Sequence, residues 1–129
     1  MRQARLTGLT YLVLLLLVAS LVAGVGSAPA AAASTKVRHV TIQNFSFAPQ
    51  TITIKAGTKV TWKNVDGFDH HLASTDSSKT TANITGLFSS KVLGTGATFS
   101  FIFKKKGTFF YECTIHASMA SMHGKVIVK

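Results

Sequence analysis

The sequence has only one cysteine, Cys113, among its 129 residues. It therefore cannot form an internal disulfide, although small secreted domains often depend on disulfides for stability. A chain of this length is expected to fold as one domain with a modest core, which gains from a further source of stability. A lone thiol in an oxidising compartment is a liability unless something occupies it. The single cysteine thus points towards a bound metal.

Acidic residues are also scarce: the sequence has four, against fourteen Lys and Arg. General acid–base catalysis needs positioned titratable groups, and we find no paired carboxylates, no nucleophile–base pair and no phosphate-binding loop. We therefore predict that the protein is not an enzyme. The excess of positive charge suits docking to acidic partner proteins or to an anionic surface. Nucleic acid is not expected as a partner, because the first residues of the chain, described in the next paragraph, form an export signal.

Charged residues are nearly absent from the start of the chain, where Arg2 and Arg5 are the only ones before Lys36. An apolar run follows over residues 9–25, and small residues dominate positions 28–33. A basic start, an apolar middle and a small-residue end form an export signal. The alternative is an uncleaved membrane anchor. A lipoprotein anchor is excluded, since no cysteine lies near the cleavage region.

Residues 1–33 are therefore predicted to be a signal peptide, and residues 34–129 the exported domain, located in the periplasm or outside the cell. Loss of the two N-terminal arginines leaves this domain with a net charge of about +8.

A long helical periodicity is missing from the exported part, and period-two alternation takes its place. Val60 and Trp62, for example, alternate with polar residues, and the turn pair Ala56-Gly57 precedes them. Such short alternating runs predict an all-β sandwich or barrel. Residues 73–96, rich in Ser, Thr and Gly, are predicted to be a long connection with at most one short strand. The predicted strands cover residues 37–47, 51–55, 58–64, 97–104, 108–113 and 125–129.

Metal-ligating side chains gather around the cysteine. Cys113 and His116 lie three positions apart at the end of a predicted strand, and a loop with Met119 and Met122 follows. His70 lies far upstream, after another strand. One thiolate, two imidazoles and a thioether are the ligands of a mononuclear copper site with a weak axial sulfur. Zinc accepts Cys and His, but a Met ligand suits copper better.

Several segments resemble the cupredoxins, the blue type 1 copper proteins, of the plastocyanin/amicyanin kind. The resemblance implies a Greek-key β-sandwich, one type 1 copper ion and one-electron transport. It assigns His70, Cys113 and His116 as copper ligands. A copper-binding or copper-delivery protein without a redox partner is the alternative function. The segments that carry the resemblance are residues 42–49, 60–70, 88–93, 99–103 and 107–116, together with the Met-x-Gly sequence at 122–124.

The axial ligand is the open point of this assignment. Met122 fits the family's entry into the last strand, whereas Met119 fits the short His-x-x-Met spacing of the amicyanin-like proteins. We favour Met122, because strand register is harder to change than loop length. Met119 would then form an apolar rim near His116.

The histidine beside the first ligand departs from the family pattern. Neighbours on an extended chain point to opposite sides, so only one of His70 and His71 is expected to reach the metal. His71, His39 and His123 are predicted to be surface residues. We also expect a monomer, with membrane contact only if the N-terminal segment is uncleaved.

Overall fold

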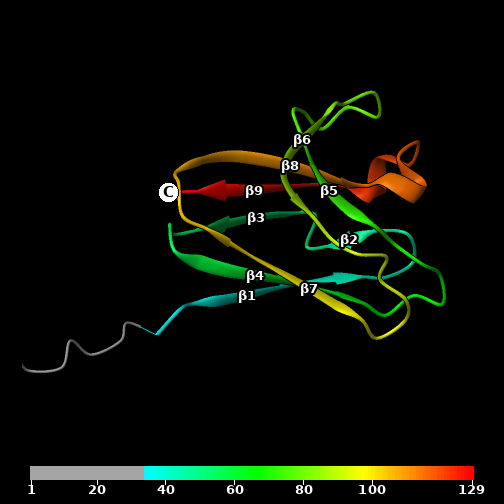
Figure 1. Ribbon diagram of the computed structural model, residues 1–129, viewed down its shortest axis with the longest axis horizontal. Helices are drawn as coiled ribbons and strands as arrows, with labels where there is room; N and C mark the ends of the chain where they lie inside the picture. Colours follow the sequence, from blue (N-terminus) through cyan, green and yellow to red (C-terminus); the bar gives the residue numbers. More distant parts are fainter. Residues whose placement is uncertain (1–33) are drawn as a thin grey trace, which may run out of the picture. The chain divides into compact units, whose positions relative to one another are not determined.

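The computed structural model describes residues 34–129, and the predicted signal peptide lies outside these described residues. The domain consists of two β-sheets that pack face to face (Figure 1). The predicted all-β sandwich is confirmed. Its strands are β1 (Val37–Ile42), β2 (Phe47–Ala48), β3 (Thr51–Ile54), β4 (Thr58–Asn64), β5 (Leu72–Thr75), β6 (Ile84–Ser89), β7 (Thr98–Phe103), β8 (Gly107–Cys113) and β9 (His123–Val128).

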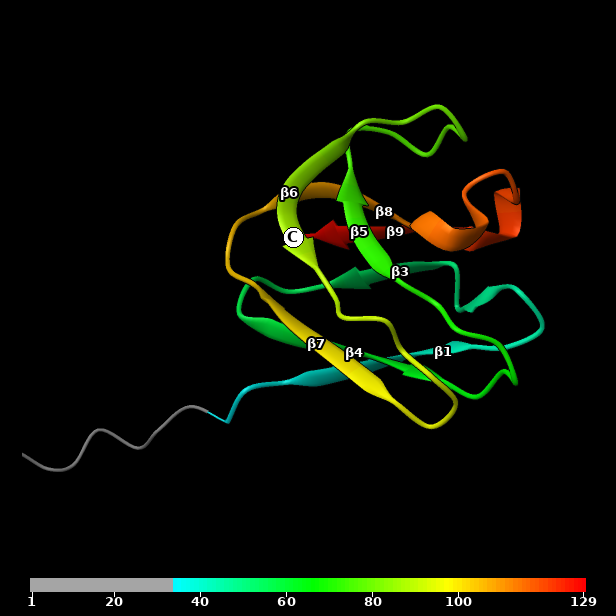
Figure 2. The ribbon, with the colours of Figure 1, turned by 45° about the vertical axis from the view of Figure 1, so that its right-hand side comes forward.

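The first sheet has the strand order β2-β1-β4-β7, and the second has the order β3-β9-β8-β5-β6 (Figure 2). The pairs β1/β4 and β3/β9 are parallel, and the other pairs are antiparallel. Parallel strands cannot be joined by a tight hairpin. The chain therefore crosses between the sheets, which brings segments far apart in sequence to the same end of the domain.

The core lies between the sheets and is rich in aromatic rings. In β4, Val60 and Trp62 are fully buried, while Lys59, Thr61 and Lys63, which alternate with them, are partly or fully exposed. The Trp62 ring packs against Tyr111 with the ring centroids 5.3 Å apart, and against Phe88 at 5.6 Å. Aromatic pairs at such separations add to the free energy gained by burying their surface. The alternation seen in the sequence thus places one face of each central strand in this core.

The sequence-based prediction allowed for one short strand in residues 73–96, so it missed a second strand there. Residues 73–96 contain β6 and most of β5, rather than a connection with at most one strand. All four residues of β5 are buried, and this strand pairs with β8 on one side and β6 on the other. Because the residues on both faces of β5 are buried, its sequence Leu-Ala-Ser-Thr shows no alternation of apolar and polar residues that could reveal it.

Helical structure in residues 34–129 is limited to two 3₁₀ turns, η1 (Thr114–His116) and η2 (Ala120–Met122). No helix in this part of the chain is long and apolar enough to cross a membrane. Both turns lie in the loop between β8 and β9, at the right in Figure 1, and they shape the site described next.

Candidate metal centre

Three potential metal-binding atoms converge at one end of the sandwich. The Sγ atom of Cys113 lies 3.5 Å from Nδ1 of His70 and 3.4 Å from Nδ1 of His116. All three atoms lie within 4.8 Å of one another. Cys113 and His70 are fully buried, while His116 is partly exposed. The geometry thus offers one sulfur and two nitrogen atoms to a single small ion.

Secondary structure explains how these residues meet. Cys113 ends β8, and its register partner Leu72 begins β5, so the segment that carries His70 runs beside the cysteine. The η1 turn directly after Cys113 folds the chain back and brings His116 to the same sulfur. The sheet register therefore supplies one histidine, and a local turn supplies the other.

Hydrogen bonds from outside the loop hold the ligand-bearing segment in place. The Gln50 side-chain amide donates to the backbone carbonyls of Ala120 and His123, at 2.9 and 2.7 Å. The Ser121 hydroxyl donates to the carbonyl of Phe45 at 2.6 Å. The loop is therefore fixed by the protein itself, which keeps the three atoms close together.

Asp66 orients the His70 ring by contacting the ring nitrogen that is not directed at Cys113. Its Oδ2 atom lies 3.0 Å from Nε2 of His70, and its carboxylate also accepts the backbone N–H groups of Asn44 and Phe45. Burial alone would raise the pKa of Asp66, but these three donors together lower it below the ordinary value. An ionised carboxylate keeps the proton on Nε2, so Nδ1 faces Cys113 with a free lone pair. Sequence reasoning missed this residue, although a carboxylate four positions before a ligand was visible.

His71 has a different role from its neighbour. Its Nδ1 atom lies 2.7 Å from the Thr114 hydroxyl, and its Nε2 atom lies 3.1 Å from the Ser89 hydroxyl. Its backbone N–H points to Cys113 Sγ at 3.5 Å. The His71 ring therefore ties β5, β6 and the cysteine segment together, and the structure brings His70 rather than His71 to the sulfur.

The two loop methionines differ sharply in environment. Met122 is fully buried in the core cluster directly before β9, whereas Met119 is 39% exposed. The backbone N–H of Met119 donates to the carbonyl of His116, and that of Met122 donates to the carbonyl of Met119. Met122 is thus placed on the interior side of the loop and Met119 on its outer side.

The prediction that His123 is a surface residue is wrong. His123 is only 3% exposed, its Nε2–H donates to the carbonyl of Ala117 at 2.7 Å, and its Nδ1 lies 3.6 Å from Oε2 of Glu112. Burial raises the pKa of Glu112, and the nearby His123 opposes that rise. His39, in contrast, is exposed as predicted. His123 directly precedes Gly124 at the start of β9, and nothing in this local sequence indicated that its ring turns inward.

Phe45 is a second residue that the sequence did not identify. Its ring centroid lies 5.0 Å from that of His116 and 4.8 Å from that of Phe68. Both Asn44 and Phe45 have positive φ angles, 52° and 53°, which turn the chain sharply after β1. This turn places the Phe45 ring over the partly exposed histidine. Burial, and then the proximity of His70, lower the pKa of His116, which favours its neutral, ligand-competent form.

Comparisons with known proteins agree with this geometry. A sequence profile of the copper-binding plastocyanin/azurin family matches residues 34–129. Tobacco (Nicotiana tabacum) plastocyanin B'/B'' is 34% identical over 91 residues, covering 64% of this chain and 87% of its own length. Amicyanin-alpha of Methylorubrum extorquens is 33% identical over 100 residues, covering 78% and 76%.

Similarity to solved structures supports the same family assignment. The purple cupredoxin from Nitrosopumilus maritimus superimposes with a TM-score of 0.62 at 28% identity, over 70% of this chain and 98% of that one. Fold, site geometry and sequence therefore agree, and the chain belongs to the plastocyanin/azurin family of copper-binding proteins.

Proposed function

We propose that the protein carries single electrons outside the cytoplasm through one copper ion held by His70, Cys113 and His116. The observation that carries this proposal is the convergence of one Sγ and two Nδ1 atoms within 4.8 Å of one another. The donors fit copper, since thiolate sulfur suits Cu(I) and imidazole nitrogen suits Cu(II). Copper supplies the chemistry of reversible one-electron oxidation and reduction.

The protein's own contribution is to hold the ligands still. Asp66 fixes the His70 ring, and His71 and Thr114 fix the chain on either side of the sulfur. Ligands fixed by the scaffold need little rearrangement when the charge of a bound ion changes. The positions of these groups therefore favour repeated electron transfer over release of the metal.

We propose Met122 as the weak axial ligand, with Met119 as the alternative. The support is burial: Met122 is fully buried on the interior side of the loop, where its thioether would be shielded from water. Met119 instead belongs to an apolar rim around His116. This rim consists of the partly exposed or exposed side chains of Phe45, Phe68, Ile115 and Met119.

A redox partner protein is proposed to dock on this apolar rim. His116 reaches the surface there, so the rim is the shortest route between a bound ion and a partner. We also propose that the partner is acidic, a proposal that rests on the net charge of the chain alone and not on charges of the rim. We further propose that the domain acts as a monomer and performs no substrate chemistry of its own. Export through the signal peptide at residues 1–33 is part of the same proposal.

The absence of histidines beside the cysteine supports simple electron carriage. Cys113 is flanked by Glu112 and Thr114, so no imidazole is available there to relay electrons to a further metal cluster. Two of the three ligands, His70 and Cys113, are also buried, which suits retention of copper rather than its delivery.

The test is a Cu(II) titration of residues 34–129, followed by visible spectroscopy and voltammetry. An intense thiolate-to-copper absorption and a rapid, reversible voltammetric response are expected. Cys113→Ser should abolish the absorption, whereas His39→Ala, at an exposed histidine on β1, should leave it unchanged. An absorption band that survives in Cys113→Ser would contradict the proposal. Ready transfer of copper to an apo acceptor would instead support the alternative function, copper delivery.

A further inference from the structure

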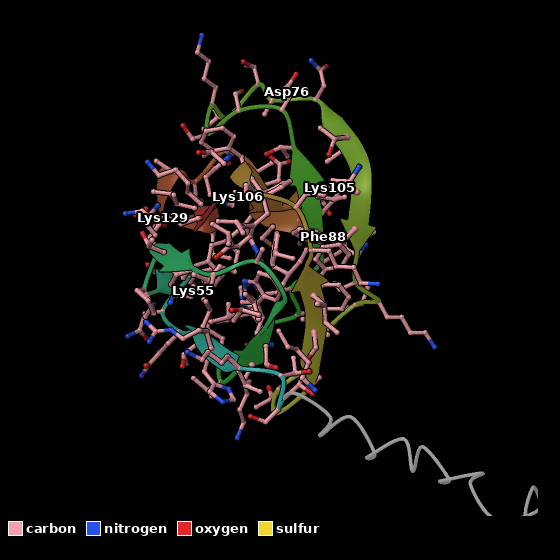
Figure 3. The ribbon with its side chains drawn as sticks, turned by 90° about the vertical axis from the view of Figure 1, so that its left-hand side faces the viewer. Lys55, Asp76, Phe88, Lys105, Lys106 and Lys129 are labelled. Carbon is pink, nitrogen blue, oxygen red and sulfur yellow. The ribbon has the colours of Figure 1, made fainter. Side chains whose placement is uncertain are left out.

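The positive charge is concentrated at one end of the domain, opposite the metal centre. Turns and strand ends from four parts of the chain meet there. The N–H of Gly57 donates to the carbonyl of Phe103, that of Ala56 to Lys129, and that of Lys59 to Lys36. We call this end the basic pole. Figure 3 shows it with several of its lysines labelled. It carries Lys36, Lys55, Lys59, Lys104, Lys105, Lys106 and Lys129.

Nothing in the described chain neutralises this pole. The four acidic residues of the sequence all lie elsewhere, three of them within four positions of His70 or Cys113 and the fourth, Asp76, in the loop between β5 and β6. No lysine in residues 34–129 forms an ion pair. The lysines therefore present an unopposed positive field to the solvent.

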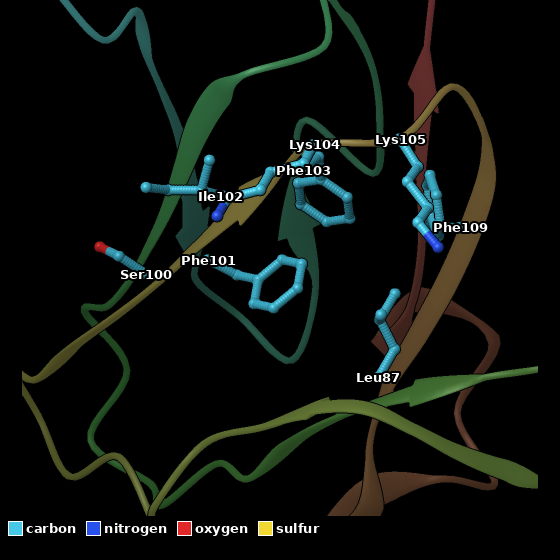
Figure 4. Close-up of a pocket in the computed structure, with 8 residues that line it drawn as sticks. All are labelled: Leu87, Ser100, Phe101, Ile102, Phe103, Lys104, Lys105 and Phe109. Atoms are coloured by element: carbon cyan, nitrogen blue, oxygen red, sulfur yellow. The ribbon is translucent and has the colours of Figure 1, made fainter.

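An exposed apolar groove adjoins the lysines. It has a volume of about 490 Å³ and lies between the edges of the two sheets, with Leu87 of β6, Phe101 of β7 and Phe109 of β8 in its walls (Figure 4). Lys104 and Lys105 flank it. Leu87 is 45% exposed, although it is a large aliphatic residue. An apolar surface bordered by one sign of charge is typical of an interaction site.

The chain also enters the domain at this end. The backbone N–H of Lys59 donates to the carbonyl of Lys36 at the basic pole, and ten residues separate Lys36 from the apolar run at residues 9–25. Ten residues span at most about 36 Å when fully extended. In the uncleaved chain, an apolar segment is therefore joined to the domain at the pole by a short stretch of sequence.

We propose that the basic pole and its groove bind the surface of an anionic lipid bilayer. Lysines beside such a surface are attracted to its charged headgroups, and apolar side chains insert at the boundary of the acyl region. The metal centre would then face away from the bilayer, towards an approaching redox partner. A partner protein bound at the basic pole would instead sit at the end of the domain farthest from the metal.

The test uses copper-loaded residues 34–129, which contain every strand that the structure describes and form a compact unit by themselves. Binding is measured by co-sedimentation with phosphatidylcholine vesicles that do or do not contain phosphatidylglycerol. We expect salt-sensitive binding to the anionic vesicles only. Replacing Lys104, Lys105 and Lys106 together by Gln should weaken it about 100-fold, since each lysine near the surface contributes about five-fold.

The matched control replaces Lys63, Lys79 and Lys91 by Gln, which changes the net charge equally but lies outside the basic pole. This control should lose less than about ten-fold in affinity. Leu87→Ser should weaken binding about five-fold through the groove. Equal losses in the two lysine triples, or no binding to anionic vesicles, would overturn the proposal. Binding to polyglutamate without any binding to vesicles would also overturn it, and would identify an acidic protein as the occupant of the pole.

Discussion

The ring of Tyr111 occupies the space that a side chain on Gly124 would need. The two residues are register partners on β8 and β9, and a Cβ atom added to Gly124 would lie 2.1 Å from Cζ of Tyr111. The tyrosine is 1% exposed and its ring also packs on Phe47, with the centroids 4.8 Å apart. The glycine after the buried methionine therefore lets a large core ring lie across the strand that leads out of the metal site.

Gly124→Ala is expected to lower the free energy of unfolding by about 2–3 kcal/mol, because overpacking a close-packed core forces side chains from their preferred positions. Urea unfolding of the copper-free domain measures the change. Gly67→Ala is the control: no atom lies within 4 Å of its added Cβ, so it should cost less than about 0.5 kcal/mol. Similar losses in both variants would contradict the argument.

Asp66→Ala is expected to weaken copper binding about 10- to 100-fold, since carboxylates that orient a metal-ligating histidine typically contribute this much. Removing a negative charge near the site should also raise the reduction potential. Competition with a copper chelator and voltammetry give the two values. Asp76→Ala is matched to it, because Asp76 also accepts hydrogen bonds, from Asn83, but lies in a distant loop. Unchanged copper affinity in Asp66→Ala would show that His70 needs no such support.

Met122→Leu is expected to raise the reduction potential while the absorption is largely kept. A weak thioether ligand donates electron density, so its loss favours Cu(I). Leu is close to Met in volume, and the free energy of unfolding should fall by less than about 1.5 kcal/mol. Met119→Leu serves as the comparison and should leave the potential unchanged. The opposite pattern, a shift in Met119→Leu alone, would assign the axial role to Met119.

Copper is expected to stabilise the folded domain, because the ligands from β8 and the segment before β5 come together only on folding. At a free copper concentration about 100 times the dissociation constant, the gain in the free energy of unfolding is about 2.7 kcal/mol. Thermal unfolding with and without copper measures it. Cys113→Ser should lose most of this gain. A melting temperature that does not rise on saturation would contradict a site that binds only the folded state.

His71→Ala is expected to loosen the site without removing a ligand. Its ring joins Thr114 and Ser89, so its loss leaves two hydroxyl groups without their partner. We expect a cost of about 1–2 kcal/mol in stability and an absorption band that is kept but broadened. Complete loss of the band would instead make His71 a ligand and overturn the assignment of His70.

Much of the candidate site was determined by the sequence itself. Cys113 and His116 are three positions apart, and a single tight turn after a strand brings such residues together whatever the rest of the chain does. The alternation in residues 58–64 likewise predicted β4 with its observed bounds. Local spacing and period-two patterning are sufficient for these features, because each depends only on neighbouring residues.

Only the tertiary structure decided which distant groups meet. The register of β5 against β8 brings His70 to the sulfur, and the turn after β1 delivers two N–H groups to Asp66. The basic pole likewise combines lysines from the chain entrance, two turns and the last residue. None of these contacts is local in sequence. Strand pairing across and between the two sheets creates them, and a pattern read along one chain holds no record of that pairing.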